Sequence, residues 1–593
     1  MRATLTPVYA FGPFLLDLGE RRLTRSGQAV AVPGKARQIL QMLAEAEGRL
    51  VSHEMFRARL WPNVVVEDRT LTVHMSTLRK VLGANDSSEY IETVTGAGYR
   101  LAVPVRTISQ AVAPPRVADS GRSLTVRPFA LESGQSEADN YLGVGMADAL
   151  TTTLGGVPGL NVRPVDGLAT GDDKPEALGG LGAGHVLEGS VRRQNERLQV
   201  SAQLIDVASG RTQWSERFER SQSDAVDLQD TIAVRVADSL AQLTTAQRRD
   251  LRGYRPRSTE AFFLQLQART HLKAYTRLPM MKALGLFEQT LALDPDYALA
   301  HAGLAWTYLL LGSTTLGRSL WPDEAMPLAR KAAERAIALD ARLAEAWAVL
   351  GRVRMEHDWD WDGAEADLAH AIALNPNSVE ALTAYGQYLG GMGRHDEAIE
   401  VTERALQLDP RQAETLHHAF LIFWMADRND RALAMLDRAL VVAPQVVRNH
   451  YGRAVLLDYL GRHDEAMESR LTFLNLYQVE PGLADEVAAL SRKSWREAMF
   501  AWLTLAERTH RWETAAIQWM AVGEPGRALA ALETCVDQRS TYMRFIAQCP
   551  AWRPLHGEPR FQKLLRTLKL EGRAEREVAD NGSSRVWHRK ANG

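Results

Sequence analysis

A repeated phrase in the second half of the chain restricts its fold more than any other feature. Five phrases that end apolar helical segments recur there: LALDPDYALA, IALDARLAEA, IALNPNSVEA, LQLDPRQAET and LVVAPQVVRN. The residues that mark them stand at 294, 340, 375, 409 and 443, so the intervals are 46, 35, 34 and 34 residues. A period of about 34 residues is that of helix–turn–helix units, which bury their apolar faces only by stacking. We therefore expect an all-α solenoid over residues 255–570, with an insertion around residues 312–322.

The clearest unit can be compared with a known family. It resembles the tetratricopeptide (TPR) repeats through Ala381, Tyr385, Gly386, Leu389, Gly393, Ala398, Ala405, Leu408 and Pro410. Gly386 and Ala398 are small, so two helices can approach closely there. A stacked array leaves a concave face, and we expect a protein or peptide partner on it. The tryptophans of this half are expected to pack between helices: Trp306, Trp347, Trp359 and Trp361.

Length and charge indicate several domains with different roles. At 593 residues the chain is too long for one core and should hold about three or four domains. The net charge is −2, but residues 1–106 carry 14 Lys and Arg against 10 Asp and Glu, a net charge of +4. This difference permits DNA binding by the front of the chain.

The two cysteines and the lack of long apolar runs indicate the cellular compartment of the protein. Cys535 and Cys549 match no zinc spacing; a disulfide and a reduced pair are both open, and we expect the reduced pair of a cytosolic protein. The sequence shows neither a signal peptide nor the run of about 20 apolar residues that a membrane helix needs. We therefore predict a cytoplasmic protein without a membrane partner.

Changes of pattern mark the domain boundaries. The stretch PVRTISQAVAPPRVADSGR, over residues 104–122, has no period and a Pro-Pro pair, so we predict a front domain over 8–106 and a linker over 107–122. Residues 123–245 form the expected middle domain. The charged tail, 571–593, is expected to be disordered.

The front domain reads as a small sheet followed by three helices and a hairpin. Alternation over residues 9–32, with a turn at Ser26-Gly27, predicts antiparallel strands. A helix over 35–46 ends at Gly48, and Ser52 is a suitable N-cap for a short helix that ends at Leu60.

The third helix, residues 69–82, is expected to be capped by Asp68 at its start and by Gly83 at its end, and it has two faces. Leu71, Met75, Leu78 and Leu82 form its buried stripe, and its outer arc is made by Arg69, Thr70, Thr72, Val73, Ser76, Thr77 and Lys80. A short helix, a loop and a longer helix are the order in which a helix-turn-helix offers one helix to the major groove. The phrase YIETVTGAGYRLAV then predicts two strands joined at residues 96–98, a wing.

Residues 8–106 resemble the OmpR/PhoB-type winged-helix domains through LVSHEMFRARLWP, EDRTLTVHMSTLRKVLG and IETVTGAGYRL. The resemblance implies that helix 69–82 enters the major groove of double-stranded DNA and that wing 93–100 touches flanking DNA. It also implies a contact of the loop Trp61–Asp68 with RNA polymerase. In that family's pattern Arg69 matches a phosphate or base contact, His74 and Arg79 match backbone contacts, and Thr93 and Tyr99 match wing contacts.

The predicted DNA-binding set is Arg69, Thr70, Thr72, His74, Ser76, Thr77, Arg79, Lys80, Thr93, Thr95, Tyr99 and Arg100. For three of these a structural role stays open. His74 could be a structural hydrogen-bonding residue, Arg79 could pair with an acid of the domain, and Tyr99 could fill the space beneath the sheet.

The chain departs from this family at Ser76, Thr77 and Thr95, where arginines are frequent. Fewer cations release fewer counterions, so each domain should bind weakly and with little salt dependence. We therefore expect binding as a homodimer or at tandem sites. We expect neither a receiver domain ahead of the winged helix nor a spanning helix behind it.

The middle domain is expected to be mixed α/β. SLTVRPF and LNVRPV read as strands, and EADNYLGVGMADALTTTLG reads as a helix. Residues 184–218 read as three strands with turns at Gln194-Asn195 and Ser209-Gly210. The phrases VLEGSVRR, QLIDVASGRTQWSERF and LGVGMADAL resemble the TolB-like N-terminal domain. That resemblance leaves assembly and ligand binding open and implies no catalysis.

No motif indicates an enzyme, a metal or a cofactor. HDWDWD, at 357–362, could bind a metal, but its place between repeat helices favours a solvated or a helix-capping role. GGLGAGH, at 179–185, lacks the context of a phosphate loop. Near the end, Phe561 and Leu564 are expected to cap the last helix. Two functions remain: a DNA-binding transcriptional regulator, which we favour, and an adaptor whose winged helix serves protein contacts.

Overall fold

The computed structural model describes residues 8–571 with gaps, the longest of which cover 61–67, 83–89, 109–122, 133–138, 165–183 and 314–319. The tail expected to be disordered, apart from residue 571, therefore lies outside the described residues. By internal contacts the chain divides into two units, one with residues 1–115 and 433–449 and the other with residues 116–432 and 450–593.

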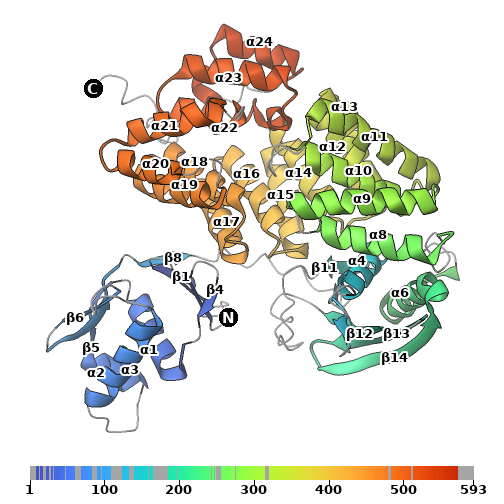
Figure 1. The fold of residues 1–593 in the computed structure, drawn as a ribbon, viewed down its shortest axis with the longest axis horizontal. Helices are drawn as coiled ribbons and strands as arrows, with labels where there is room; N and C mark the ends of the chain where they lie inside the picture. The colour runs from blue at the N-terminus through green and yellow to red at the C-terminus, as the bar shows by residue number, and fades with distance from the viewer. Residues whose placement is uncertain are drawn as a thin grey trace. The chain divides into compact units, whose positions relative to one another are not determined.

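The first unit begins with an antiparallel sheet (Figure 1). Its strands are β1 (Val8–Phe11), β2 (Phe14–Asp17), β3 (Arg22–Arg25), β4 (Gln28–Val30) and β8 (Val105–Ile108), in the order β4-β3-β2-β1-β8. Strand β8 pairs with β1 from Val105 opposite Phe11 to Ile108 opposite Val8. The predicted boundary at 106 is therefore wrong by two residues, because part of the expected linker completes the sheet. The turn expected at Ser26-Gly27 lies outside the described residues, but β3 and β4 form the expected hairpin.

Three helices and a second small sheet complete the winged helix. The helices are α1 (Gly34–Glu45), α2 (His53–Leu60) and α3 (Asp68–Val81), and the sheet has the order β5 (Val51–Ser52), β7 (Gly98–Leu101), β6 (Ile91–Val94). One apolar core joins both sheets to the helices, and Phe14, Leu40 and Leu78 are fully buried in it.

The middle domain is α/β, as expected from the sequence. Strands β9 (Ser123–Val126), β11 (Asn161–Pro164), β12 (His185–Gln194), β13 (Arg197–Asp206) and β14 (Arg211–Ser221) lie in the order β11-β9-β12-β13-β14, and β10 (Ala130–Leu131) pairs with β12. Helices α4 (Tyr141–Gly155) and α6 (Ala225–Ala241) pack on this sheet. The turn between β13 and β14 is at Ser209-Gly210, as predicted, with Gly210 at a φ of 67°. The TolB-like resemblance stays a prediction.

The remaining chain is helical, and its helices alternate with short turns at the predicted period. They are α8 (Thr259–Leu272), α9 (Arg277–Leu293), α10 (Ala298–Gly312), α11 (Pro322–Leu339), α12 (Ala344–Val353), α13 (Trp361–Leu374), α14 (Val379–Gly391), α15 (His395–Leu408), α16 (Ala413–Met425), α17 (Asn429–Val442), α18 (Val447–Tyr459), α19 (His463–Tyr477), α20 (Leu483–Ser491), α21 (Trp495–Arg508), α22 (Trp512–Ala521), α23 (Pro525–Asp537) and α24 (Pro559–Thr567).

Small residues set the spacing of helices in the clearest repeat. A Cβ atom on Gly386 of α14 would lie 3.0 Å from the hydroxyl of Thr402 on α15. Helices α10, α12, α14 and α16 contact one another in series and form one face of the array. Part of this face is covered by the chain itself, because Arg544 of the 3₁₀ segment Thr541–Phe545 donates to Gln387 Oε1 of α14 at 3.1 Å.

The tryptophans and the acidic phrase take structural positions. Trp306, Trp359 and Trp361 are buried, and the Trp347 indole donates to the Ala341 carbonyl at 2.9 Å. Asp360 of the HDWDWD phrase caps α13 through a bond from the Gly363 amide, which confirms the capping interpretation. Phe561 and Leu564 are buried in α24.

Two further findings concern the cysteines and the membrane. Cys535 and Cys549 are both free and buried, and burial raises the pKa of Cys549 to about 11, so its thiol stays protonated at neutral pH. Among the helices of the described residues, none has the length and apolar character needed to cross a membrane.

Candidate nucleic-acid interface

Helix α3 presents a stripe of three polar residues and one valine to solvent, because its buried apolar residues fix its rotation. Leu71, Met75, Leu78 and Leu82 are buried at 3% exposure or less, as the heptad-like spacing predicts. The opposite side is exposed, and its residues are Thr72, Val73, Ser76 and Lys80. We refer to these four residues as the α3 stripe.

Local contacts hold α2 in place beside α1. The Ser52 hydroxyl accepts a hydrogen bond from the Met55 amide at 3.2 Å, so Ser52 caps α2 as predicted. At the other end, Lys35 Nζ donates to the Leu60 carbonyl at 2.8 Å, which satisfies one of the free carbonyls at a helix C-terminus.

The wing depends on two glycines. Gly96 has a φ of 75° and turns the hairpin between β6 and β7. At Gly98 a Cβ atom would lie 2.1 Å from the carbonyl oxygen of Val51, so only glycine lets β5 pair with β7. The backbone thus fixes the root of the wing against the start of α2.

Arg79 joins α3 to the wing. Its guanidinium donates to the Ile91 carbonyl at 2.8 Å and to the Thr93 hydroxyl at 2.7 Å, and it lies 5.9 Å from the centre of the Tyr99 ring. In the described part of the domain the groups that Arg79 meets are neutral, so an acidic partner for it is not found there. These bonds orient the wing relative to the helix.

Tyr99 is a core residue. It is 6% exposed, and its ring packs 6.2 Å from that of Phe56 and 5.5 Å from that of His53. This confirms the interpretation that Tyr99 fills the space beneath the sheet. Arg100 is exposed and forms an ion pair with Glu92 at 2.8 Å, so its charge is locally balanced.

The other predicted residues occupy different positions. His74, Thr70 and Thr77 are half-buried, and the Thr77 hydroxyl donates to the Val73 carbonyl at 3.0 Å within its own helix. Thr93 is exposed on β6. The Arg69 side chain, Thr95, Gly83 and the loop 61–67 lie outside the described residues.

The predicted set omitted one residue that the structure places at the centre of the stripe. Val73 is 58% exposed, so its apolar side chain faces solvent, as does that of Met55 on α2, at 54%. Its place on the outer arc of the helix is the sequence signal for this exposure. Apolar groups on a recognition helix can contact the methyl group of thymine.

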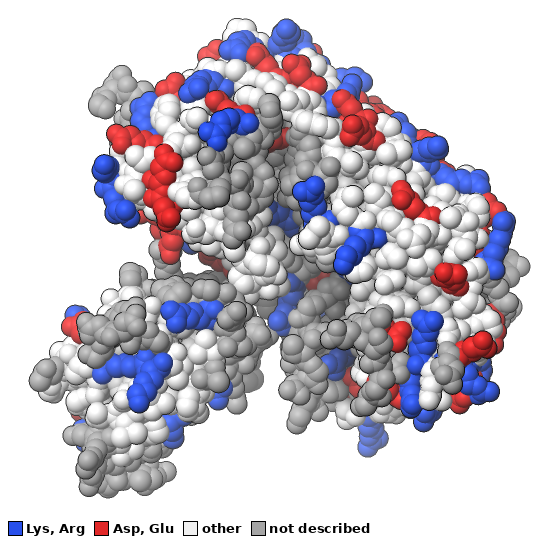
Figure 2. All heavy atoms as spheres, viewed as in Figure 1, with Lys and Arg blue, Asp and Glu red and all other residues white. Residues whose placement is uncertain are grey.

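The exposed basic side chains of the first unit are suited to binding a polyanion. On the face shown in Figure 2, basic side chains are spread over the coloured part of the N-terminal domain and acidic ones are sparse. The described cations on and near the helices include Arg49, Arg57 and Lys80, which are all exposed. Such a surface attracts the phosphate backbone without reading sequence.

Comparison with protein families supports this description. Residues 27–101 match the model described as "Transcriptional regulatory protein, C terminal", and residues 360–413 and 419–469 match the model of the tetratricopeptide repeat. The N-terminal domain is thus of the OmpR/PhoB type, and the helical region carries TPR repeats.

Three curated relatives share different parts of the chain. The transcriptional regulator HilA of Salmonella typhi is 25% identical over 411 residues, which cover 68% of this chain and 71% of HilA. The putative adenylate cyclase 3 of Rhizobium meliloti is 32% identical over 202 residues, 33% of this chain and 34% of that protein. The phosphate regulon regulatory protein PhoB of the same organism is 31% identical over 98 residues, 16% of this chain and 43% of PhoB.

Proposed function

We propose that this chain, which joins an OmpR/PhoB-type domain to TPR repeats, is a transcriptional regulator that binds double-stranded DNA through α3 and the wing. The observation that carries the proposal is the α3 stripe: four exposed side chains on one side of a helix whose other side is buried. The similarity to HilA along most of both chains supports the same function.

Each part of the interface has a separate task in this proposal. Thr72 and Ser76 offer hydroxyls to base edges, Val73 offers an apolar contact to a thymine methyl, and Lys80 neutralises a phosphate. Thr93 and Arg100 lie on the wing and meet flanking DNA. Arg79 and Tyr99 act indirectly, since they hold the wing in place.

The sparse charge of the stripe suggests how the DNA site is organised. With one cation among four exposed residues, a single domain should bind weakly. We propose that two copies bind half-sites about one helical turn of DNA apart, which is the arrangement that dimeric helix-turn-helix proteins use.

Two further contacts are part of the proposal. The family resemblance of the loop at 61–68 suggests RNA polymerase as a partner. The TPR array suggests a protein partner, which would use the part of the α10–α16 face that Arg544 and its neighbours leave free. Partner binding there would change oligomerisation or the freedom of the winged helix.

The test is genome-wide DNA capture with the tagged full-length protein and two matched variants. Thr72→Glu/Ser76→Glu/Lys80→Glu reverses the charge of the α3 stripe. Thr231→Glu/Arg235→Glu/Ser239→Glu makes the same change in charge at three exposed positions with the same spacing on α6 of the middle domain. Discrete peaks upstream of genes, lost in the α3 variant and kept in the α6 variant, are the expected result.

A second function, an adaptor without DNA binding, is favoured by the absence of arginine at Ser76 and Thr77. A flat capture profile from folded, expressed protein would support the adaptor. The same result would make the TPR partner the main question.

A further inference from the structure

A cavity of about 450 Å³ lies between the middle domain and the repeats. Helices α4 and α8 form two of its walls, and four successive turns between repeats form another, at residues 297–299, 340–345, 374–380 and 409–412. These turns contain three of the residues that mark the sequence period, namely Asp340, Asn375 and Asp409. Small-molecule sites in proteins typically have volumes of about 300–1,000 Å³, so this cavity is large enough for a ligand.

Hydrogen bonds between the two domains fix the walls. Asn377 Nδ2 donates to the carbonyls of Gly155, at 3.1 Å, and Leu160, at 2.8 Å. A Cβ atom on Gly155 would lie 3.0 Å from the amide of Asn375, so the end of α4 fits closely against this turn. The walls of the cavity therefore belong to the middle domain and the repeats, which contact each other within the second unit.

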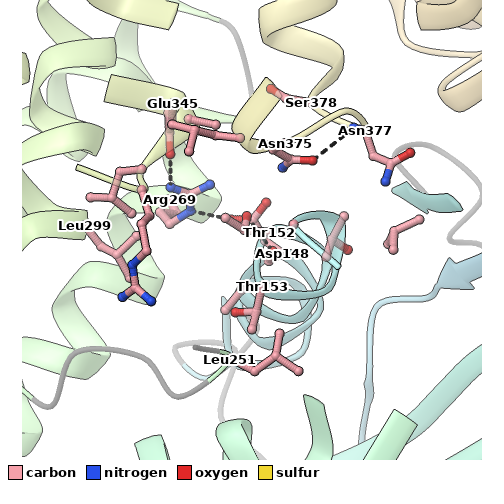
Figure 3. A pocket seen from close by; sticks show the side chains of 18 of the residues that line it. Asp148, Thr152, Thr153, Leu251, Arg269, Leu299, Glu345, Asn375, Asn377 and Ser378 are labelled. Atoms are coloured by element: carbon pink, nitrogen blue, oxygen red, sulfur yellow. Dashed lines mark hydrogen bonds and ion pairs between the residues drawn. The ribbon is translucent and has the colours of Figure 1, made fainter. Parts of the chain in front are cut away.

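One side of the cavity is apolar. It is lined by residues of the middle-domain core and by α8: Val157, Val162, Leu243, Leu251 and Phe262. Figure 3 shows Leu251 on the side of α4 away from Ser378. A ligand that fills the cavity would place an apolar body against this side.

The other side carries charges whose basic members already have acidic partners in the cavity. Arg269 pairs with Asp148 and, at 2.8 Å, with Glu345 (Figure 3). Lys273 pairs with Asp148 at 2.7 Å. Arg342 pairs with Asp340 at 3.0 Å. An anionic ligand would have to compete with these carboxylates for each cation.

Glu380 also lines the cavity, and its carboxylate forms no ion pair among the described residues. Its carboxylate accepts a hydrogen bond from the Ser378 hydroxyl at 3.4 Å. Burial raises the pKa of Glu380, and the charges of Glu345 and Asp148 act in the same direction, while Lys273 opposes them. A cation beside Glu380 would stabilise its charged form.

Gln265, on α8, provides a second, independent indication of a ligand. It is 3% exposed and lines the cavity, yet nothing in the described part of the chain makes a hydrogen bond with its side chain. Amide groups of buried side chains in proteins usually have a hydrogen-bonding partner. A ligand N–H group could donate to its oxygen.

We propose that this cavity binds a small organic cation, a primary amine on an apolar body, with the ammonium group at Glu380 and the body against the wall that contains Leu251. Such a ligand would bridge the middle domain and the repeats and so stabilise their docked arrangement. The proposal does not depend on DNA binding, because its test contains no DNA.

The test is isothermal titration of the full-length protein with three compounds that share one apolar body: hexylamine, hexan-1-ol and hexanoate. Phenethylamine provides a second amine with a different body. We expect the amines to bind, the alcohol to bind more weakly and hexanoate not to bind. Glu380→Gln should weaken amine binding by at least about tenfold, because hydrogen bonds to charged groups contribute about 1.5–3 kcal/mol.

The control is Glu334→Gln, which changes an exposed glutamate of α11 and should leave amine affinity unchanged. A melting curve of each variant verifies that it is folded, and a bound amine should raise the melting temperature. The proposal is overturned if neither amine binds, if hexanoate binds as tightly as hexylamine, or if Glu380→Gln keeps full affinity.

Discussion

Arg79 illustrates how a side chain expected at the DNA can serve the domain instead. Its two hydrogen bonds run to β6, so it couples the orientation of the wing to α3. We expect Arg79→Ala to destabilise the wing by about 1.5–3 kcal/mol, since both bonds involve a charged donor. Hydrogen exchange of residues 91–101 in the full chain measures this, and Lys80→Ala, an exposed neighbour, is the control. Equal protection in the two variants would contradict the coupling.

The sparse charge of α3 leads to a prediction about salt. Ser76→Arg should make the slope of log K against log salt concentration steeper by about 0.9, and Lys80→Ala should make it shallower by about 0.9, since each phosphate contact releases one counterion. Titration of a nonspecific duplex with the full-length protein at several salt concentrations measures both slopes. If both substitutions leave the slope unchanged, α3 does not face the phosphates.

At the scale of the element, the two glycines of the wing have different tasks. Gly98→Ala places a methyl group against the Val51 backbone and should cost more than about 2 kcal/mol, whereas Gly96→Ala meets open space and should cost about 1–2 kcal/mol for its positive φ. Hydrogen exchange of β5 and β7 compares the two variants. Similar losses of protection in the two variants would mean that position 98 requires glycine for its backbone conformation and not for its close approach to Val51.

At the scale of the whole molecule, Asp148 connects the middle domain to the repeats. Burial alone would raise its pKa, but Arg269 and Lys273 together hold the pKa of Asp148 well below its usual range. A carboxyl whose pKa is lower in the folded than in the unfolded chain stabilises the fold at pH values above its unfolded pKa, about 3.9. This contribution is lost as the pH falls from there through the folded pKa. The docking of α4 on α8 should therefore weaken in acid.

The corresponding variant is Asp148→Asn. Removal of one partner of a buried ion pair costs about 3–5 kcal/mol, so this variant should lose protection in α4 and α8 at neutral pH and respond less to acid than the wild type. Asp139→Asn, which breaks a looser pair with Arg193 at 3.8 Å, is the control. Hydrogen exchange is the suitable measurement because a multidomain chain does not unfold in one step. Equal losses of hydrogen-exchange protection in the two variants would contradict the role of Asp148.

Features with a local, periodic signal could be predicted from the amino-acid sequence. The 34-residue interval predicted the helical repeats, and the spacing of Leu71, Met75, Leu78 and Leu82 predicted which side of α3 is buried. In both cases burial repeats with the geometry of the helix, so a short window of sequence contains the whole pattern. The same holds for the capping of α2 by Ser52, which involves residues three apart.

Contacts between distant parts of the chain could not be predicted from local sequence patterns. Strand β8 joins the first sheet although residues 107 and 108 fall in the predicted linker, because strand pairing depends on a partner about 100 residues away. Arg269 meets Asp148 across 121 residues and Glu345 across 76. The cavity exists only because these segments meet, so no local pattern could have predicted that the repeat-marking turns form one of its walls.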